Sequence, residues 1–178
     1  MRWTKWLILP AFCGMTILTG TAFALADTTV EIKGVHLCCG ACVKGVATAL
    51  KDVEGVTPKC DQKAGTVTLT AKDNATAQKG LDALSDAGYF GSTGSKSLTL
   101  KPAADVPSGK VSTLKLTNAH NCCGSCCKAI KAAVAKVDGV KGDTAKPKMA
   151  DFEVTGDFSA AAVVKALNEA GFQVKVGK

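Results

Sequence analysis

An internal repeat constrains the fold more than any other feature of this sequence. The chain reads HLCCGACVKGV from residue 36 and HNCCGSCCKAI from residue 120, 84 residues later. Two later pairs of segments match at nearly the same offset: DVEGV (52–56) with KVDGV (136–140), and LDALSDAGYF (81–90) with VKALNEAGFQ (164–173). A repeat of this kind predicts two copies of one folding unit.

Each copy carries the same order of hydrophobic patterns. Alternating apolar and polar residues predict strands, and apolar residues at helical spacing predict helices. In the first copy the expected elements are strand 28–35, helix 43–53, a weak strand 56–59, strand 66–71, helix 74–88 and strand 96–101. Asn74 is the expected N-cap of the second helix, and Gly88 its C-terminal glycine.

The order β-α-β-β-α-β is that of a ferredoxin-like unit. The predicted fold class is therefore α+β, with two ferredoxin-like βαββαβ units, each an antiparallel four-stranded sheet with two helices on one face. The segment KPAADVPSGK (101–110) has two prolines, a glycine and no apolar periodicity, which predicts a linker. The expected domains are residues 27–100 and 111–178.

Residues 1–26 have the pattern of a secretory signal peptide. Arg2 and Lys5 precede an apolar run, and Ala24-Leu25-Ala26 forms a small-x-small cleavage motif. We expect cleavage after Ala26, loss of Cys13 with the leader, and a secreted or periplasmic protein. The run would hold the chain in a membrane only if it stayed uncleaved.

Charge and cysteine content narrow the function of the mature chain. Cleavage leaves 20 basic and 15 acidic residues, a net charge of +5, and the lysines are dispersed, so the sequence does not predict nucleic-acid binding. Eight cysteines in an exported chain are compatible with a disulfide framework. However, seven of the eight gather in the two repeated motifs, together with both histidines, whereas a framework links distant segments.

Each motif contains a C-x-x-C pair where a predicted strand gives way to a predicted helix: Cys39 with Cys42, and Cys123 with Cys126. Unpaired N–H groups and the positive end of the helix dipole then face both sulfurs, which lowers the thiol pKa. Thiolates bind Cu(I), Zn(II) and similar soft ions in preference to Mg²⁺ or Ca²⁺. The spacing therefore predicts soft-metal capture.

In these motifs, in VEGV…GTVTLT and in ALSDAGY, the chain resembles the heavy-metal-associated family. That family includes copper chaperones, the repeats of copper-transporting ATPases and the periplasmic mercury-binding protein. The resemblance covers both units and implies one soft ion per domain, most often Cu(I) or Hg(II). It also implies a metal-transferring partner protein or a membrane transporter. The implied metal-binding residues are Cys39, Cys42, Cys123 and Cys126.

Both motifs depart from the family pattern Gly-Met-x-Cys-x-x-Cys. The replacements occur at matched positions: His36 and His120 for the glycine, Leu37 and Asn121 for the methionine, and Cys38 and Cys122 for the variable residue. The added cysteines are either further metal ligands or surface thiols. The histidines are ligands, supports of ligands, or ordinary core or surface residues. A third sulfur and an imidazole would complete a tetrahedral Zn(II) site.

The remaining residues of interest have structural explanations. Cys127 aligns with Val43 in the apolar stripe of the first helix, so we expect it in the core. Tyr89 and Phe172 follow the second helix of each unit and are expected to pack near the metal loop. Cys60 has no counterpart in the second unit, and no role is assigned to it.

These patterns predict a binding module and not an enzyme: an exported carrier, chaperone or scavenger of a soft metal ion. Two alternatives stay open. A C-x-x-C pair permits dithiol exchange, so the chain could be a thiol-disulfide oxidoreductase. It could also be a structural module whose cysteines are locked as disulfides.

Overall fold

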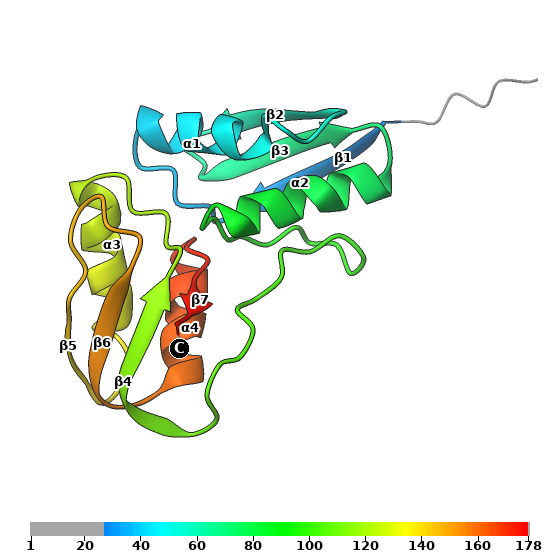
Figure 1. Ribbon diagram of the computed structural model, residues 1–178. Coiled ribbons are helices and arrows are strands. Elements are labelled where there is room, and N and C mark those ends of the chain that lie inside the picture. Colours follow the sequence, from blue (N-terminus) through cyan, green and yellow to red (C-terminus); the bar gives the residue numbers. More distant parts are fainter. Residues whose placement is uncertain (1–26, 178) are drawn as a thin grey trace, which may run out of the picture.

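The computed structural model describes residues 27–177, so the predicted signal peptide lies outside the described residues. The chain forms two halves, each with two helices packed on an antiparallel sheet (Figure 1). The first half contains β1 (Thr28–Lys33), α1 (Gly40–Leu50), β2 (Val56–Asp61), β3 (Thr66–Ala71) and α2 (Asn74–Asp86). The second contains β4 (Lys110–Thr117), α3 (Gly124–Val134), β5 (Val140–Asp143), β6 (Phe152–Ser159), α4 (Ala160–Glu169) and β7 (Lys175–Val176).

The strands of each half pair in antiparallel register. The first sheet has the order β1-β3-β2, and the second has the order β5-β6-β4-β7. Burial alternates along β1, β3 and β4, because one face of each sheet is covered by the helices of its half. The described residues thus form a mixed α/β fold with four helices and two antiparallel sheets, consistent with ferredoxin-like units.

The prediction of a four-stranded first sheet is wrong, because residues 96–101 form no strand. Only one bridge remains at the position of the fourth strand: Lys33 and Ser92 exchange backbone hydrogen bonds of 2.8 and 2.9 Å. The matched position of the second half holds the regular pair of Thr117 with Lys175. The first sheet therefore has a single bridge where the second sheet has a fourth strand.

The segment leaves the sheet because other groups bind its backbone. The chain turns at Gly94, which has a φ of 66°. Beyond the turn, the side chain of Gln78 on α2 donates to the carbonyl of Thr99 at 3.0 Å and accepts from its N–H at 3.3 Å. Leu98 and Leu100 are buried, so the segment packs as an extended cover rather than as a strand.

Helix α2 is capped one residue earlier than predicted. The N-cap is Asp73 and not Asn74, since the carboxylate of Asp73 accepts from the N–H of Thr76 at 2.7 Å. This bond lowers the pKa of Asp73, and a negative charge at a helix N-terminus is favourable. Gly88 follows the helix with a φ of 83°, in agreement with the prediction of a C-terminal glycine.

The two halves meet through the turns that follow α2 and α4. The N–H of Phe90 donates to the carbonyl of Gly171 at 3.1 Å. The N–H of Gln173 donates to the carbonyl of Gly88 at 3.0 Å. Because these residues occupy matched positions of the repeat, the contact has approximate two-fold symmetry.

Glycine is required at both of these turns. A Cβ on Gly88 would overlap the backbone of residues 118–120, and a Cβ on Gly171 would overlap the backbone of residues 34–36. Both glycines also have a positive φ, 83° and 88°. Each half therefore presses a glycine turn against the segment that leads into the cysteine motif of the other half.

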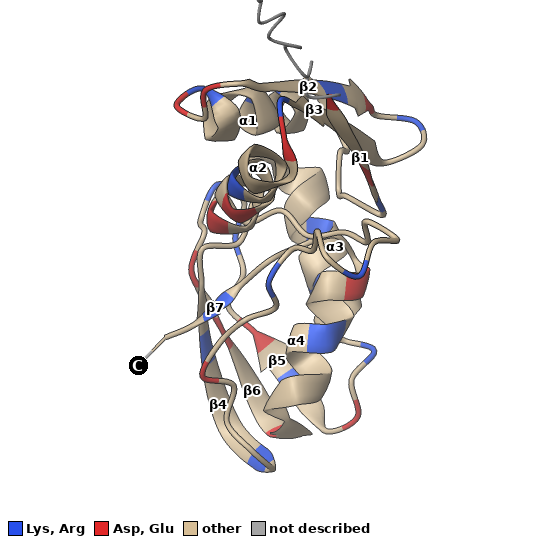
Figure 2. Cartoon of the chain, turned by 90° about the vertical axis from the view of Figure 1, so that its right-hand side faces the viewer, with Lys and Arg blue, Asp and Glu red and all other residues tan. Residues whose placement is uncertain are grey.

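Charged residues contribute little to this contact. Basic and acidic side chains are scattered over both halves (Figure 2). The pair Lys175–Asp86 crosses between the halves at 2.8 Å, but both side chains are exposed. Exposed pairs stabilise a fold by less than about 1 kcal/mol. Backbone hydrogen bonds and buried aromatic rings hold the halves together instead.

Replacing Gly88 with alanine tests this contact. Gly94→Ala is the matched control, because Gly94 also has a positive φ but no atom lies within 4 Å of its added Cβ. The control should lose about 1 kcal/mol of unfolding free energy from backbone strain alone. Gly88→Ala should lose about 2 kcal/mol more, since its Cβ meets backbone of the other half. Urea unfolding of the reduced, metal-free chain measures both, and equal losses would contradict the contact.

Candidate metal centre

Both C-x-x-C pairs lie at a strand-to-helix junction, as the spacing predicts. Cys39 is the N-cap residue of α1 and Cys123 is that of α3, and both have extended backbones. Cys42 and Cys126 lie in the first turns of these helices and are fully buried. The unpaired N–H groups at the two helix starts therefore lie beside the cysteine sulfurs.

The structure brings the two motifs into one cluster. Its members, here called the six-sulfur cluster, are Cys38, Cys39, Cys42, Cys122, Cys123 and Cys126. Neighbouring sulfurs in the cluster are 3.5–4.0 Å apart. The sequence predicts a separate site on each unit, and the number of ions stays a prediction. The structure places the C-x-x-C pair of one half directly beside that of the other half.

Contacts between the halves are as short as contacts within them. The Cys38 sulfur lies 3.5 Å from that of Cys126, and the Cys42 sulfur lies 3.6 Å from that of Cys122. The two C-x-x-C pairs have internal separations of 3.9 Å for Cys39–Cys42 and 3.8 Å for Cys123–Cys126. Neither half alone therefore defines the surroundings of its own sulfurs.

Each histidine packs on the aromatic residue of the opposite half. The ring centroids of His36 and Phe172 are 4.5 Å apart, and those of His120 and Tyr89 are 4.2 Å apart. The hydroxyl of Tyr89 also donates to the carbonyl of Cys42 at 2.7 Å and lies 3.2 Å from Nε2 of His120. The predicted packing of Tyr89 and Phe172 near the metal loop is confirmed, and it crosses between the halves.

Both histidines also lie beside the cluster. Donor atoms of His36, Cys38 and Cys126 lie within 4.8 Å of one another, as do those of His120, Cys42, Cys122 and Cys126. Burial lowers the pKa of both imidazoles, to about 4 for His120, so both are neutral near pH 7. Neutral imidazole is the metal-binding form. Nε2 of His36 is buried without a hydrogen-bond partner among the described residues.

The thiols of the cluster differ in their acidity. Burial raises the pKa of Cys38 and Cys126, and raises that of Cys122 to about 12. The pKa of Cys123 is lowered to about 6, chiefly by a hydrogen bond from the backbone of Cys126. Burial also opposes ionisation of Cys42, but hydrogen bonds from Cys39 and neighbouring thiols outweigh it and lower its pKa. Without metal, thiolate character is therefore strongest at one cysteine of each half.

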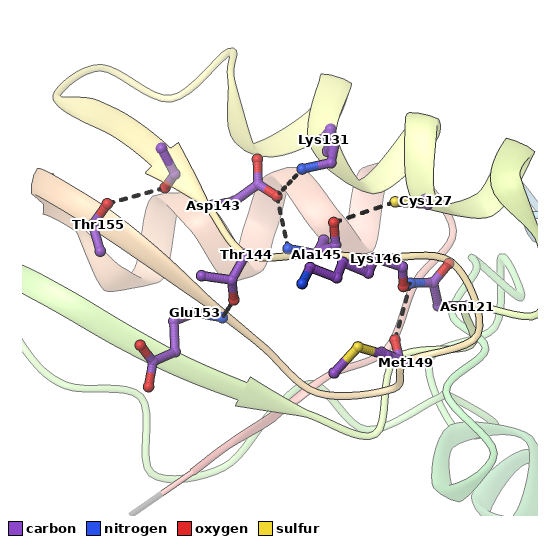
Figure 3. A network of polar contacts seen from close by, with 11 residues as sticks. Asn121, Cys127, Lys131, Asp143, Thr144, Ala145, Lys146, Met149, Glu153 and Thr155 are labelled. Atoms are coloured by element: carbon purple, nitrogen blue, oxygen red, sulfur yellow. Dashed lines mark hydrogen bonds and ion pairs between the residues drawn. The ribbon is translucent and has the colours of Figure 1, made fainter.

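The other two described cysteines lie outside the cluster. Cys127 is buried and its thiol donates to the carbonyl of Ala145 at 3.5 Å, which confirms its predicted place in the core (Figure 3). Cys60 lies on β2, half-buried, and burial raises its pKa. Its position gives it no part in the cluster.

Asn121 fixes the second motif loop. Its side-chain amide donates to the carbonyls of Lys146 and Met149, at 2.8 and 2.9 Å (Figure 3). The matched residue of the first half, Leu37, is buried as well. The position that the heavy-metal-associated family fills with methionine therefore serves in both halves to anchor the motif loop to the core.

The two halves differ at two matched positions whose side chains are in contact, and the sequence patterns did not predict this contact. Gly45 of α1 lies against the hydroxyl of Tyr89, and a Cβ there would overlap that oxygen. The second half has Ala129 and Phe172 at the matched positions, so the Cβ is present where the hydroxyl is absent. The two exchanges, compared across the repeat, were the available signal that Tyr89 reaches α1.

Comparisons with known proteins add little to this picture. No family model matches the chain, and no curated protein matches it. Among solved structures, the N-terminal soluble domains of Bacillus subtilis CopA align with 85% of this chain and 95% of that chain, with 15% sequence identity and a TM-score of 0.32. At this TM-score the alignment carries no argument, so the case for metal binding depends on the geometry of the cluster.

The Gly45–Tyr89 contact predicts coupling in a double-mutant cycle. In the natural chain, Gly45→Ala should lower the unfolding free energy by about 2 kcal/mol, because the Cβ meets the Tyr89 hydroxyl. In the Tyr89→Phe background the loss should shrink to less than about 1 kcal/mol, because alanine favours a helix and only Cε1 of His120, 3.1 Å from the Cβ, must still shift. Urea unfolding of the four proteins measures the coupling, and additive effects would refute the contact.

Proposed function

We propose that this chain is an exported soft-metal-ion binding protein that carries, delivers or scavenges a thiophilic ion. Residues 27–100 and 111–178 would be ferredoxin-like domains joined by the linker 101–110. The ligands would be the cysteines of the six-sulfur cluster, with His36 and His120 as added donors. The observation that carries the proposal is the convergence of six cysteine sulfurs at separations of 3.5–4.0 Å.

The sulfur separations suit three- or four-coordinate ions. Metal–sulfur bonds of about 2.3 Å separate two ligands by about 3.8 Å in a tetrahedral site and about 4.0 Å in a trigonal one. The C-x-x-C sulfurs are 3.9 and 3.8 Å apart. Linear coordination, as in two-coordinate Hg(II) or Cu(I), would need about 4.6 Å at the same bond length. The separations therefore suit three-coordinate Cu(I) and four-coordinate Zn(II) alike. The number of soft thiolates favours Cu(I), and Zn(II) is the alternative.

Differences in exposure support a role in transfer. Cys42 and Cys126 are fully buried, whereas Cys39 and Cys123 are half-buried with their sulfurs 4.0 Å apart. A thiolate of a partner protein can approach a bound ion over these two residues and replace its ligands one at a time. The partner would be a metal-transferring protein or a membrane transporter.

Export is proposed from the leader alone. The signal pattern of residues 1–26, with cleavage after Ala26, lies outside the described residues, and it supports a secreted or periplasmic location. Within residues 27–177, none of the helices has the length and apolar character that a membrane span needs.

Dithiol exchange is the competing use of these cysteines. A lowered pKa and partial exposure give Cys123 the character of an attacking thiolate. Burial raises the pKa of its C-x-x-C partner, Cys126, so that thiol stays protonated and attacks a mixed disulfide on Cys123 slowly. Insulin reduction separates the two functions, and robust turnover would favour the oxidoreductase. Intact-mass analysis of the native protein, with and without reductant, would reveal permanently locked disulfides.

Serine replacement of the C-x-x-C cysteines tests the proposal. A chain carrying Cys39→Ser, Cys42→Ser, Cys123→Ser and Cys126→Ser should bind Cu(I) more than about 100-fold more weakly, because the loss of supporting residues alone costs up to that factor. Anaerobic competition with a chromogenic Cu(I) chelator measures the affinity.

Cys60→Ser provides the control, since this thiol is half-buried and lies outside the cluster. Its Cu(I) affinity should equal that of the natural chain. Undiminished Cu(I) uptake by the quadruple variant would overturn the proposed function. Circular dichroism of both variants establishes that the fold is retained.

A further inference from the structure

We propose that the six-sulfur cluster holds one polynuclear Cu(I)–thiolate centre shared by both halves, in which Cys38 and Cys122 each bind an ion together with sulfurs of the opposite half. This inference rests on the proposed function and replaces the count of one ion per domain that the family resemblance implies. It assigns a role to the two cysteines that the C-x-x-C pattern leaves unexplained.

Every closed triangle of sulfurs draws on both halves. A triangle suits one three-coordinate Cu(I) ion, whose sulfurs lie about 4.0 Å apart once the side chains adjust to the bound ion. Three such triangles have sides of 3.5–3.8 Å: Cys38–Cys42–Cys126, Cys42–Cys122–Cys126 and Cys38–Cys123–Cys126. An ion in any of them binds sulfurs from both motifs, so the halves cannot load independently.

The triangles also share sulfurs. Cys126 is a corner of all three, and Cys38 and Cys42 are each corners of two. A sulfur shared by two occupied triangles is a bridging thiolate. Soft thiolates bridge Cu(I) ions readily, because the sulfur has several lone pairs and the ion accepts three ligands.

The triangles set the expected number of ions. If each of the three triangles holds one ion, the cluster contains about three Cu(I) ions. Two independent C-x-x-C sites would contain two. A single Zn(II) needs only four donors, such as His120 with Cys42, Cys122 and Cys126, and would leave other sulfurs of the cluster unused. Each bound thiol releases its proton, and copper stays Cu(I) throughout, so no oxidant or reductant is consumed.

Contacts away from the sulfurs hold the two motif loops in place. The backbone bonds of Phe90 with Gly171 and of Gln173 with Gly88 join the halves. The stacking of His36 on Phe172 and of His120 on Tyr89 then orients each motif loop from the opposite half. The triangles therefore exist before metal arrives, which favours loading as a unit.

Native mass spectrometry of the reduced full chain tests the proposal. Cu(I), supplied anaerobically as its acetonitrile complex, is added in steps. We expect metal-free chains and chains with about three ions to dominate throughout, with few intermediates. X-ray absorption at the copper edge should report three sulfur neighbours and a short copper–copper distance.

Single substitutions of Cys38 and Cys122 extend the test. Cys38→Ser should lower the maximum by about two ions, because a bridging thiolate serves two of them. Cys122→Ser is a second, independent variant and should lower the maximum by about one ion, because Cys122 is a corner of one triangle. Cys60→Ser should leave the number of ions and their distribution unchanged.

The outcomes separate the two proposals. Two ions that bind independently, or one ion per chain, would overturn the shared cluster and leave the proposed function standing. An unchanged number of bound Cu(I) ions in both Cys38→Ser and Cys122→Ser would also overturn the shared cluster. Cu(I) uptake that does not depend on any of the six cysteines would overturn the shared cluster and the proposed function together.

Discussion

The reciprocal contact between the two matched turns is the interaction on which the rest of the structure depends. Backbone bonds between Phe90 and Gly171, and between Gln173 and Gly88, align the halves about an approximate two-fold axis. That axis brings together the starts of α1 and α3, and with them two sets of thiols and two positive helix ends. Neither the sulfur triangles nor the crossed histidine contacts would form if the halves packed in another orientation.

Local pattern was enough to predict much of the fold. The repeat, the helices and most strands follow from hydrophobic period, and the C-x-x-C pairs lie at strand-to-helix junctions as their spacing requires. The lost fourth strand could not be predicted, since residues 96–101 alternate like a strand but are bound by Gln78. The N-cap was off by one because Asp73 and Asn74 are both good caps.

The candidate site was predicted residue by residue but not as a single arrangement. Periodicity describes what each half buries, and it contains no information on how two finished halves meet. Cys38 and Cys122 could therefore be placed only as further ligands or surface thiols, although their sulfurs approach those of the opposite half to 3.5 and 3.6 Å. The pairing of Tyr89 with Gly45 carried a trace of the contact, and it is intelligible only with the three-dimensional structure.

The linker between the halves keeps the two cysteine motifs together when the protein is diluted. Two separate single-domain molecules could assemble a comparable set of sulfurs only by dimerising, and their joint site would dissolve as the protein became scarce. Here the linker 101–110 tethers the two, so that each motif experiences its counterpart at an effective concentration on the order of millimolar. The six sulfurs would thus stay together at any abundance of the protein.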